Sequence, residues 1–118
     1  MAQWRLSRPA EADIANILAT SRANWGTDGR RRYAALLTAV MRLVSADPRG
    51  PATRDRADLL VGIRSLHLRH ARAAAPQAAV RRPVHVIYVR VRQPGLVEII
   101  RVLHERMEPS RHIDSDPP

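Results

Sequence analysis

The apolar positions in the first quarter of the chain repeat every three or four residues, which is the spacing of a helix with one buried face. They are Ala10, Ile14, Ile17 and Leu18. Ser7 precedes them in the position of an N-cap, and Pro9 suits the first helical turn, so the pattern predicts a helix that begins near Arg8. The glycines in "WGTDG" (25–29) are expected to end it.

A second apolar stripe follows the same helical spacing without a break. It consists of Tyr33, Leu36, Leu37, Val40, Met41 and Val44. The segment "DPRGP" (47–51) is expected to stop this helix, because proline and glycine both interrupt helices. Two helices joined by a short turn, each with one apolar face, form a hairpin that needs a surface to cover.

The second half of the chain is rich in β-branched residues and predicts strands. The candidate strands are 61–70, 84–91 and 96–104, after a short first strand at 3–7. "RQPG" (92–95) is a turn signal, and residues 71–83 are expected to form a loop with at most a short helical turn. The sequence therefore predicts an α+β fold in the order β-α-α-β-β-β, with a small antiparallel sheet and the helical hairpin packed on one face.

The chain length of 118 residues suits one domain, which we place at 1–113, followed by a disordered tail at 114–118. There is no cysteine, which excludes a disulfide framework and a thiolate metal site, and we expect no metal and no cofactor. No apolar run approaches the roughly 20 residues of a membrane span, and residues 1–14 lack the basic-then-apolar pattern of a signal peptide. We therefore expect a cytoplasmic protein without a membrane partner.

The charge is strongly positive, with a formal net charge of +9 and twenty basic residues that are all arginine. Ten arginines and three glutamates lie between residues 62 and 112. Such an excess favours an acidic partner, either a nucleic acid or an acidic protein segment. With only four aromatic residues, a base-stacking platform for single strands is disfavoured.

Three arginines lie amid apolar neighbours on three predicted strands. They are Arg64, Arg90 and Arg101. A guanidinium within a sheet face is costly unless it is paired or exposed. Because nearby carboxylates are scarce, we expect some of these arginines to bind a carboxylate of a partner; the alternative is that they point to solvent from one open face.

The histidines have structural interpretations beside chemical ones. His67 and His70, three residues apart on a predicted strand, would lie on opposite faces, which disfavours a shared metal ion. On a central strand, His85 favours a hydrogen-bonded, partly buried residue over a catalytic one. At a strand end, His104 favours packing against the C-terminal segment over catalysis.

Several segments, in order, resemble toxins of the RelE/ParE superfamily from type II toxin-antitoxin modules, closest to ParE. They are "LSRPAEADIANI" at the first helix, "WG" (25–26) followed by Tyr33, "GIRSLHLRHAR" (62–72), "VIYVRV" (86–91) and "VEIIRVLHERMEPSRHI" (97–113). Two features depart from the family. Gly29 and the arginine run at 30–32 stand where a Gln-Ala pair is common, and the loop at 71–83 is longer than usual.

The resemblance implies a toxin neutralised by a cognate acidic, ParD-like antitoxin whose extended segment wraps the basic sheet and helices. We assign the antitoxin contact to Arg64, Arg90 and Arg101, and expect contact with operator DNA only through the antitoxin. ParE-like members inhibit DNA gyrase without a catalytic reaction, whereas RelE-like members cleave messenger RNA on the ribosome. Fold alone does not decide between these functions.

Ribonucleolytic cleavage needs a base, cations and an acid that converge on the phosphate. By position, His85 replaces a strand arginine of the nucleases, Arg106 matches their basic residue after the last strand, and His112 lies near their C-terminal Tyr or His. Only one of three positions is unchanged, and the chain has no lysine. The gyrase inhibitor is therefore favoured over the nuclease, and a basic accessory domain that binds nucleic acid is a third hypothesis.

The C-terminal segment at 104–113 is the candidate surface for target binding. Its candidate contacts are His104, Arg106, Met107, Arg111 and His112, with Arg106 the foremost. Met107 and Ile113 are expected to anchor the segment to the sheet as apolar side chains.

Overall fold

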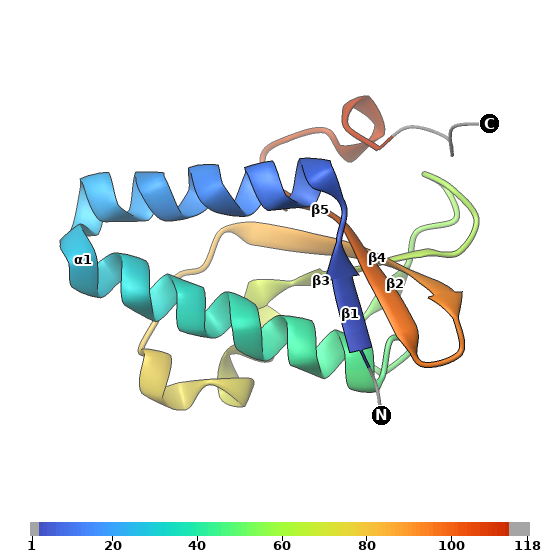
Figure 1. Cartoon of the computed structure of the whole chain (residues 1–118), viewed down its shortest axis with the longest axis horizontal. Coiled ribbons are helices and arrows are strands. Elements are labelled where there is room, and N and C mark those ends of the chain that lie inside the picture. Colours follow the sequence, from blue (N-terminus) through green and yellow to red (C-terminus); the bar gives the residue numbers. More distant parts are fainter. Residues whose placement is uncertain (1–2, 114–118) are drawn as a thin grey trace.

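The computed structural model describes residues 3–113, in which a helical hairpin covers one face of a five-stranded sheet (Figure 1). The elements are β1 (Gln3–Leu6), α1 (Arg8–Ala46), β2 (Arg54–Asp55), β3 (Ile63–His67), β4 (His85–Gln93) and β5 (Leu96–His104), with short 3₁₀ helices η1 (Leu68–Ala74), η2 (Pro76–Ala78) and η3 (Pro109–Arg111). The predicted α+β fold is confirmed. The predicted tail at 114–118 lies outside the described residues.

The first helical turn is tied to the sheet through Ser7. Its Oγ accepts a hydrogen bond from the backbone nitrogen of Ala10 at 3.1 Å, which is the predicted N-cap. The same hydroxyl donates to the carbonyl of Ile100 at 2.7 Å, and the Ser7 backbone nitrogen donates to Ile99 at 3.0 Å. The cap therefore fixes the angle between β1, the helix and β5.

The two predicted helices are the two arms of α1, which fold back on each other at Gly26 (Figure 1). Gly26 has φ 75°, a backbone conformation that favours glycine, and the helix resumes directly after it. The second arm thus begins earlier than the apolar stripe alone predicts. It ends at Ala46, before the predicted "DPRGP" stop.

The main core lies between α1 and the sheet. Both predicted apolar stripes face it, and its most buried members from α1 are Ala10, Leu36, Leu37, Val40 and Val44. From the sheet, Leu66, Ile87, Val89, Val97, Ile99 and Val102 meet them. Along β4 these positions alternate with side chains on the opposite face, whereas on β5 a register shift at Tyr88/Val89 lets both Ile99 and Val102 face the main core.

The sheet has the order β1-β5-β4-β3-β2. The predicted antiparallel meander β3-β4-β5 is present, but β1 pairs with β5 in parallel, with Trp4 opposite Val97, so the sheet is mixed. The parallel pairing follows from the helical hairpin, which carries the chain away from β1 before the meander starts. β1 covers only residues 96–99 of β5.

The predicted strand at 61–70 is too long, since β3 ends at His67 and the chain turns into η1. His67 caps this turn, because its Nδ1 accepts a hydrogen bond from the Arg69 backbone nitrogen at 3.1 Å. His67 and His70 therefore do not lie on opposite faces of one strand: their rings approach edge to face, with centroids 6.3 Å apart. The short η1 and η2 helices fill part of the predicted loop at 71–83.

A second, smaller apolar cluster lies on the sheet face that α1 leaves uncovered. It consists of Ile63, Tyr88, Leu103 and Ile113, edged by Leu59, Leu60, Val86 and Ile100. Ile113 is the predicted anchor of the C-terminal segment, whereas Met107 is 38% exposed and does not serve as one. None of the helices within residues 3–113 has an apolar stretch long enough to cross a membrane.

Candidate functional site

The uncovered face of the sheet carries an open groove with a volume of about 840 Å³. Its walls are the segment before β3, the outward residues of β3 and β4, and the segment after β5. The lining residues are Pro51, Ala52, Arg54, Arg56, Ser65, His67, Arg69, His70, Val86, Tyr88, Glu105, Met107, Glu108 and Pro109. A floor of Val86 and Tyr88 between charged walls suits an extended segment with alternating apolar and charged side chains.

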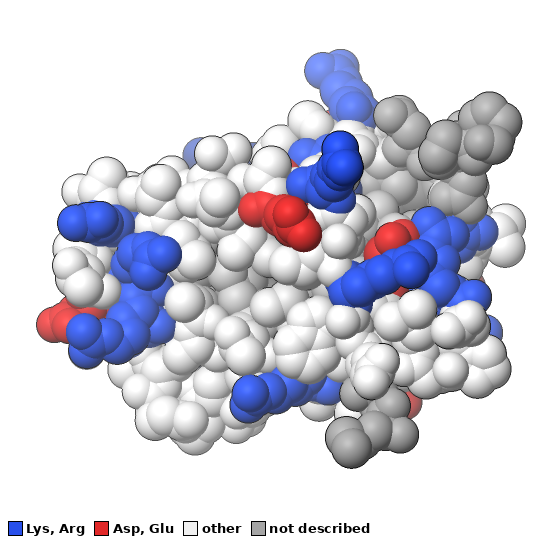
Figure 2. Space-filling model, viewed as in Figure 1, with Lys and Arg blue, Asp and Glu red and all other residues white. Residues whose placement is uncertain are grey.

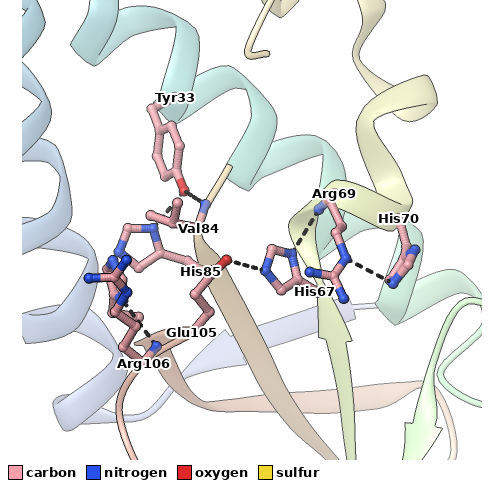
Figure 3. Close-up of polar contacts among 9 residues, drawn as sticks. Tyr33, His67, Arg69, His70, Val84, His85, Glu105 and Arg106 are labelled. Atoms are coloured by element: carbon pink, nitrogen blue, oxygen red, sulfur yellow. Dashed lines mark hydrogen bonds and ion pairs between the residues drawn. The ribbon is translucent and has the colours of Figure 1, made fainter. Parts of the chain in front are cut away.

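A histidine–glutamate pair crosses one end of the groove (Figure 3). Since His67 Nδ1 already accepts from the Arg69 backbone, its Nε2 carries the proton and donates to Glu105 Oε1 at 2.8 Å. This bond, together with the nearby His104 and Arg69, lowers the pKa of Glu105. Both nitrogens of His67 are therefore occupied, and the ring has no free lone pair to serve as a general base.

Few of the arginines in the groove are paired with carboxylates of the chain itself. Arg56 donates to both carboxylate oxygens of Asp58, at 3.1 and 3.0 Å, and lies 6.0 Å from the centroid of the Tyr88 ring. The hydrogen bond from Arg56 lowers the pKa of Asp58. Arg69 donates to His70 Nε2 at 3.3 Å, a neutral partner, so the groove keeps cationic groups with capacity for further anions.

His85 lies on the helix side of β4, where Tyr33 from α1 meets it (Figure 3). The Tyr33 hydroxyl accepts from the Val84 backbone nitrogen at 3.3 Å and shares a second hydrogen bond with His85 Nδ1, 2.5 Å away. Burial, with the neighbouring His104, lowers the pKa of His85 to about 4. Burial raises the pKa of Tyr33 to about 12, so both partners of this bond are neutral near pH 7.

The candidate nuclease set of His85, Arg106 and His112 stays a prediction, and the structure shows the surroundings of its members. No hydrogen bond joins these three residues within the described part of the chain. His85 has its Nδ1 occupied and a pKa far below neutrality, whereas a catalytic base works best with a pKa near the operating pH. His85 instead fits the structural interpretation, a partly buried, hydrogen-bonded residue.

Arg101 already binds a carboxylate inside the chain. Its Nε and Nη2 donate to the two oxygens of Asp13 at 2.7 and 2.8 Å, and its Nη1 donates to the carbonyl of His112 at 2.8 Å. Asp13 also accepts from the Val102 backbone nitrogen at 3.0 Å. The argument that Arg101 needs an external acid therefore does not apply, and this clasp fixes the C-terminal segment to α1 and β5.

Arg64 and Arg90 differ from Arg101 in their surroundings. Arg64 donates to Thr53 Oγ1 at 3.0 Å and to the Thr53 carbonyl at 3.3 Å, so its hydrogen-bond partners within residues 3–113 are neutral. Arg90 stands beside Glu98 in the sheet register and lies over Gly62, where an added Cβ would come within 3.2 Å of the guanidine Nε. Their binding to an antitoxin stays a prediction.

The C-terminal segment emerges from β5 with its cations outward. His104 is half-buried, with its ring edge against His85 at a centroid distance of 5.5 Å, and its Nδ1 accepts from the Arg106 backbone at 3.1 Å. The Arg106 and Arg111 side chains are exposed, and His112 is half-buried beside the clasp. The segment therefore presents a pinned backbone with free basic side chains, the geometry expected of a contact surface.

Some residues of this region are absent from the sequence prediction. Asp13, the acid that Arg101 requires, lies 88 residues away in the first helix, and its place beside the apolar stripe was the available signal. The groove residues Arg54 and Arg56 lie in no quoted motif, in or just after the two-residue β2, and Tyr88 lies in the family segment at 86–91 but was assigned no role there. Within residues 3–113, no three His, Asp or Glu side chains converge to hold a metal ion.

Comparison with known proteins places this geometry in a family. The family model described as "ParE toxin of type II toxin-antitoxin system, parDE" matches residues 4–109. The chain is 32% identical to Toxin ParE1 of Caulobacter vibrioides over 114 residues, which are 96% of this chain and 99% of that protein. A solved structure titled "Chromosomal ParDE TA system from P. aeruginosa" shares the fold, with a TM-score of 0.64 at 16% identity over 88% of this chain and 96% of that chain.

The matched region contains both arms of α1, all of the groove-forming strands and the start of the C-terminal segment. The resemblance to ParE drawn from the sequence is thus confirmed. The chain belongs to the family of ParE toxins of the type II toxin-antitoxin system parDE.

Proposed function

We propose that this toxin inhibits DNA gyrase in the cytoplasm by binding it, without a catalytic reaction of its own. The observation that carries the proposal is the state of His85: neutral, with its Nδ1 occupied by the Tyr33 hydroxyl, and with no hydrogen bond to Arg106 or His112. A nuclease would need that position for a base or a cation at the phosphate. Membership in the ParE family supports the same function.

The contact with the target is assigned to the C-terminal segment, with Arg106 at its centre and His104, Met107, Arg111 and His112 around it. The clasp of Arg101 on Asp13 and on the His112 carbonyl holds the backbone of this segment in place. A fixed backbone with exposed cations loses little entropy when it binds. This supports the segment as a preorganised binding element.

The antitoxin is assigned to the groove, with Arg64 and Arg90 as further contacts outside the groove lining. The groove offers cationic walls that are only partly matched by its own carboxylates, above a floor of Val86 and Tyr88. An extended acidic segment fits such a surface, with its carboxylates on the arginines and its apolar side chains on the floor. Operator DNA would then be reached only through the antitoxin.

Expression of the toxin alone, with parallel readout of gyrase supercoiling activity and messenger RNA integrity within minutes, tests this function. We expect inhibited gyrase, double-strand breaks and intact messages. Rapid cleavage of messages with normal supercoiling would overturn the proposal and favour the RelE-like nuclease.

Arg106→Ala tests the target contact, with Arg42→Ala as the matched control because Arg42 is an exposed arginine on α1, outside the C-terminal segment. We expect Arg106→Ala to relieve growth arrest while antitoxin binding stays within about tenfold, since the loss of a central arginine contact costs more than 1 kcal/mol. Unchanged toxicity of Arg106→Ala would remove this residue from the target surface.

A further inference from the structure

The bend of α1 exposes a tryptophan. Trp25 is 75% exposed, and it lies at the tip where the two arms of the hairpin meet (Figure 1). Burial of an indole is strongly favourable compared with its exposure to water, so an exposed tryptophan marks a candidate interaction site. None of the residues of α1 lines the groove, which makes the tip a separate surface.

Two glycines build the tip around this indole. Gly26 takes φ 75°, and nothing lies within 4 Å of a Cβ added there, so this glycine serves the backbone turn. At Gly29, an added Cβ would come within 2.3 Å of the Trp25 Cβ. The close approach of position 29 to Trp25 therefore depends on glycine.

The tip is also strongly basic. Arg22, Arg30, Arg31 and Arg32 surround it, with Asp28 as its one acid, and Figure 2 shows basic atoms gathered at this end of the molecule. Arg31 lies 3.7 Å from Asp28, with both side chains about three-quarters exposed, and Arg32 Nε donates to the Asp28 carbonyl at 3.4 Å. Such an exposed pair is weak, so the charge is available to a partner.

We propose that this tip, formed by Arg22, Trp25 and residues 28–32, is a second contact surface for the protein target of the toxin. It would receive an apolar pocket of the target over the indole, with carboxylates of the target rim against the arginines. The inference rests on the proposed function, in which the target is DNA gyrase. The tip would contact the target in addition to the C-terminal segment, and the two surfaces are far apart in the sequence.

A protein partner fits the tip better than a nucleic acid does. Tryptophan and arginine are the residues that dominate binding energy at protein interfaces. Single-stranded nucleic acids need a row of aromatic side chains, and the tip holds one; duplex DNA would use the arginines but leave the indole without a pocket. The isolated indole within a ring of cations therefore points to a carboxylate-rimmed pocket.

The experiment compares the full chain with Trp25→Ala and with the double variant Arg30→Glu/Arg31→Glu, using Arg42→Ala as a control. Circular dichroism and thermal unfolding first establish that each variant is folded. Growth arrest in cells, inhibition of purified gyrase and affinity for the antitoxin are then measured. We expect both tip variants to lose at least about fivefold in gyrase inhibition and in arrest, with antitoxin affinity within about twofold.

Each alternative outcome has a separate meaning. If both tip variants inhibit gyrase and arrest growth as the wild type does, the tip is not a target contact, while the proposed function still holds. If the wild type arrests growth without affecting gyrase, the proposed function fails. The inference about the tip is then still tested, because weaker growth arrest by the tip variants supports a target contact and unchanged arrest contradicts it. If the wild type binds duplex DNA with steep salt dependence and the variants lose only that binding, the occupant is nucleic acid and the inference is wrong.

Discussion

The two faces of the sheet are built from the same strands but have opposite properties. On the helix face, side chains such as Leu66, Ile87 and Ile99 are at most 2% exposed and meet both arms of α1. On the other face, a cluster centred on Ile63 and Tyr88 is bordered by arginines, histidines and glutamates. Alternation along each strand thus separates a surface that stabilises the fold from one that is free to bind.

Substitutions on the helix face should therefore change stability, and substitutions on the groove face should change binding. The helix face has one large core that excludes water, and deletion of its atoms leaves a cavity. The groove face has an apolar floor with exposed charged walls, whose ion pairs contribute little to folding.

Leu36→Ala should destabilise the protein by about 2–5 kcal/mol, because the side chain is 1% exposed and its loss opens a cavity between α1 and the sheet. Urea or thermal unfolding measures the change. Met107→Ala, at a 38% exposed position beside the groove, is the control and should cost less than about 1 kcal/mol. Equal losses at the two positions would contradict the division between the faces.

Asp13→Ala should cost about 2–3 kcal/mol, since it removes a charge-assisted pair with Arg101 and the acceptor of the Val102 backbone. It should also release the C-terminal segment, because Arg101 loses the group that orients it toward the His112 carbonyl. Hydrogen exchange of residues 104–113 measures this effect, with Glu11→Ala as an exposed control on the same helical arm. Unchanged exchange would show that the clasp does not fix the segment.

His85 should make stability depend on pH in a defined window. Its pKa is about 4 in the folded protein and near 6.5 in the unfolded chain, so the unfolded chain binds the proton first as the pH falls. Stability should therefore decrease from pH 6.5 toward 4, by on the order of 1 kcal/mol after allowance for partial exposure of the ring. The lowered pKa of Glu105 acts below pH 4.5, in a separate range.

Unfolding of His85→Gln measured between pH 4.5 and 6.5 isolates this contribution. The substitution keeps an acceptor for the Tyr33 hydroxyl and removes the titrating ring. The difference between wild type and variant should shrink toward pH 4.5. A constant difference across the window would exclude His85 as the source of the pH dependence.

Arg56→Ala should change stability by less than about 1 kcal/mol, since its partner Asp58 is a largely exposed carboxylate. Affinity for the antitoxin should nevertheless fall, and added salt should weaken the wild-type complex because screening reduces the attraction between charges. Arg49→Ala, an exposed arginine outside the groove, is the control. If antitoxin affinity changes neither with added salt nor with Arg56→Ala, burial of apolar surface dominates the complex.

The elements with strong periodicity could be predicted from the sequence. The start of α1 at Arg8 and the bounds of β5 follow directly from capping and from β-branched runs. The parallel pairing of β1 and the two-residue β2 depend on how distant segments meet, which no local pattern encodes. The same limit applies to Asp13 and Arg101, a contact made across 88 positions.

The sequence predicts the chemical character of the candidate site better than its location in the fold. Basic charge and the family resemblance predict an acidic partner and a C-terminal contact, but the groove forms only when 51–56, β3 and 105–109 converge. The sequence places His67 within a strand that runs on to His70, whereas its two nitrogens bind Arg69 and Glu105 at the point where β3 becomes η1. The tertiary fold alone brings those partners together.

The brevity of β1 has a consequence for how the molecule behaves at high concentration. Beyond residue 99, no strand within residues 3–113 pairs with the outer side of β5, and such an open border can pair with a strand of another molecule. The Asp13 carboxylate occupies the Val102 amide at that border and places a negative charge beside it. The monomer is thereby guarded against strand-to-strand assembly, and loss of this one carboxylate should promote aggregation as well as unfolding.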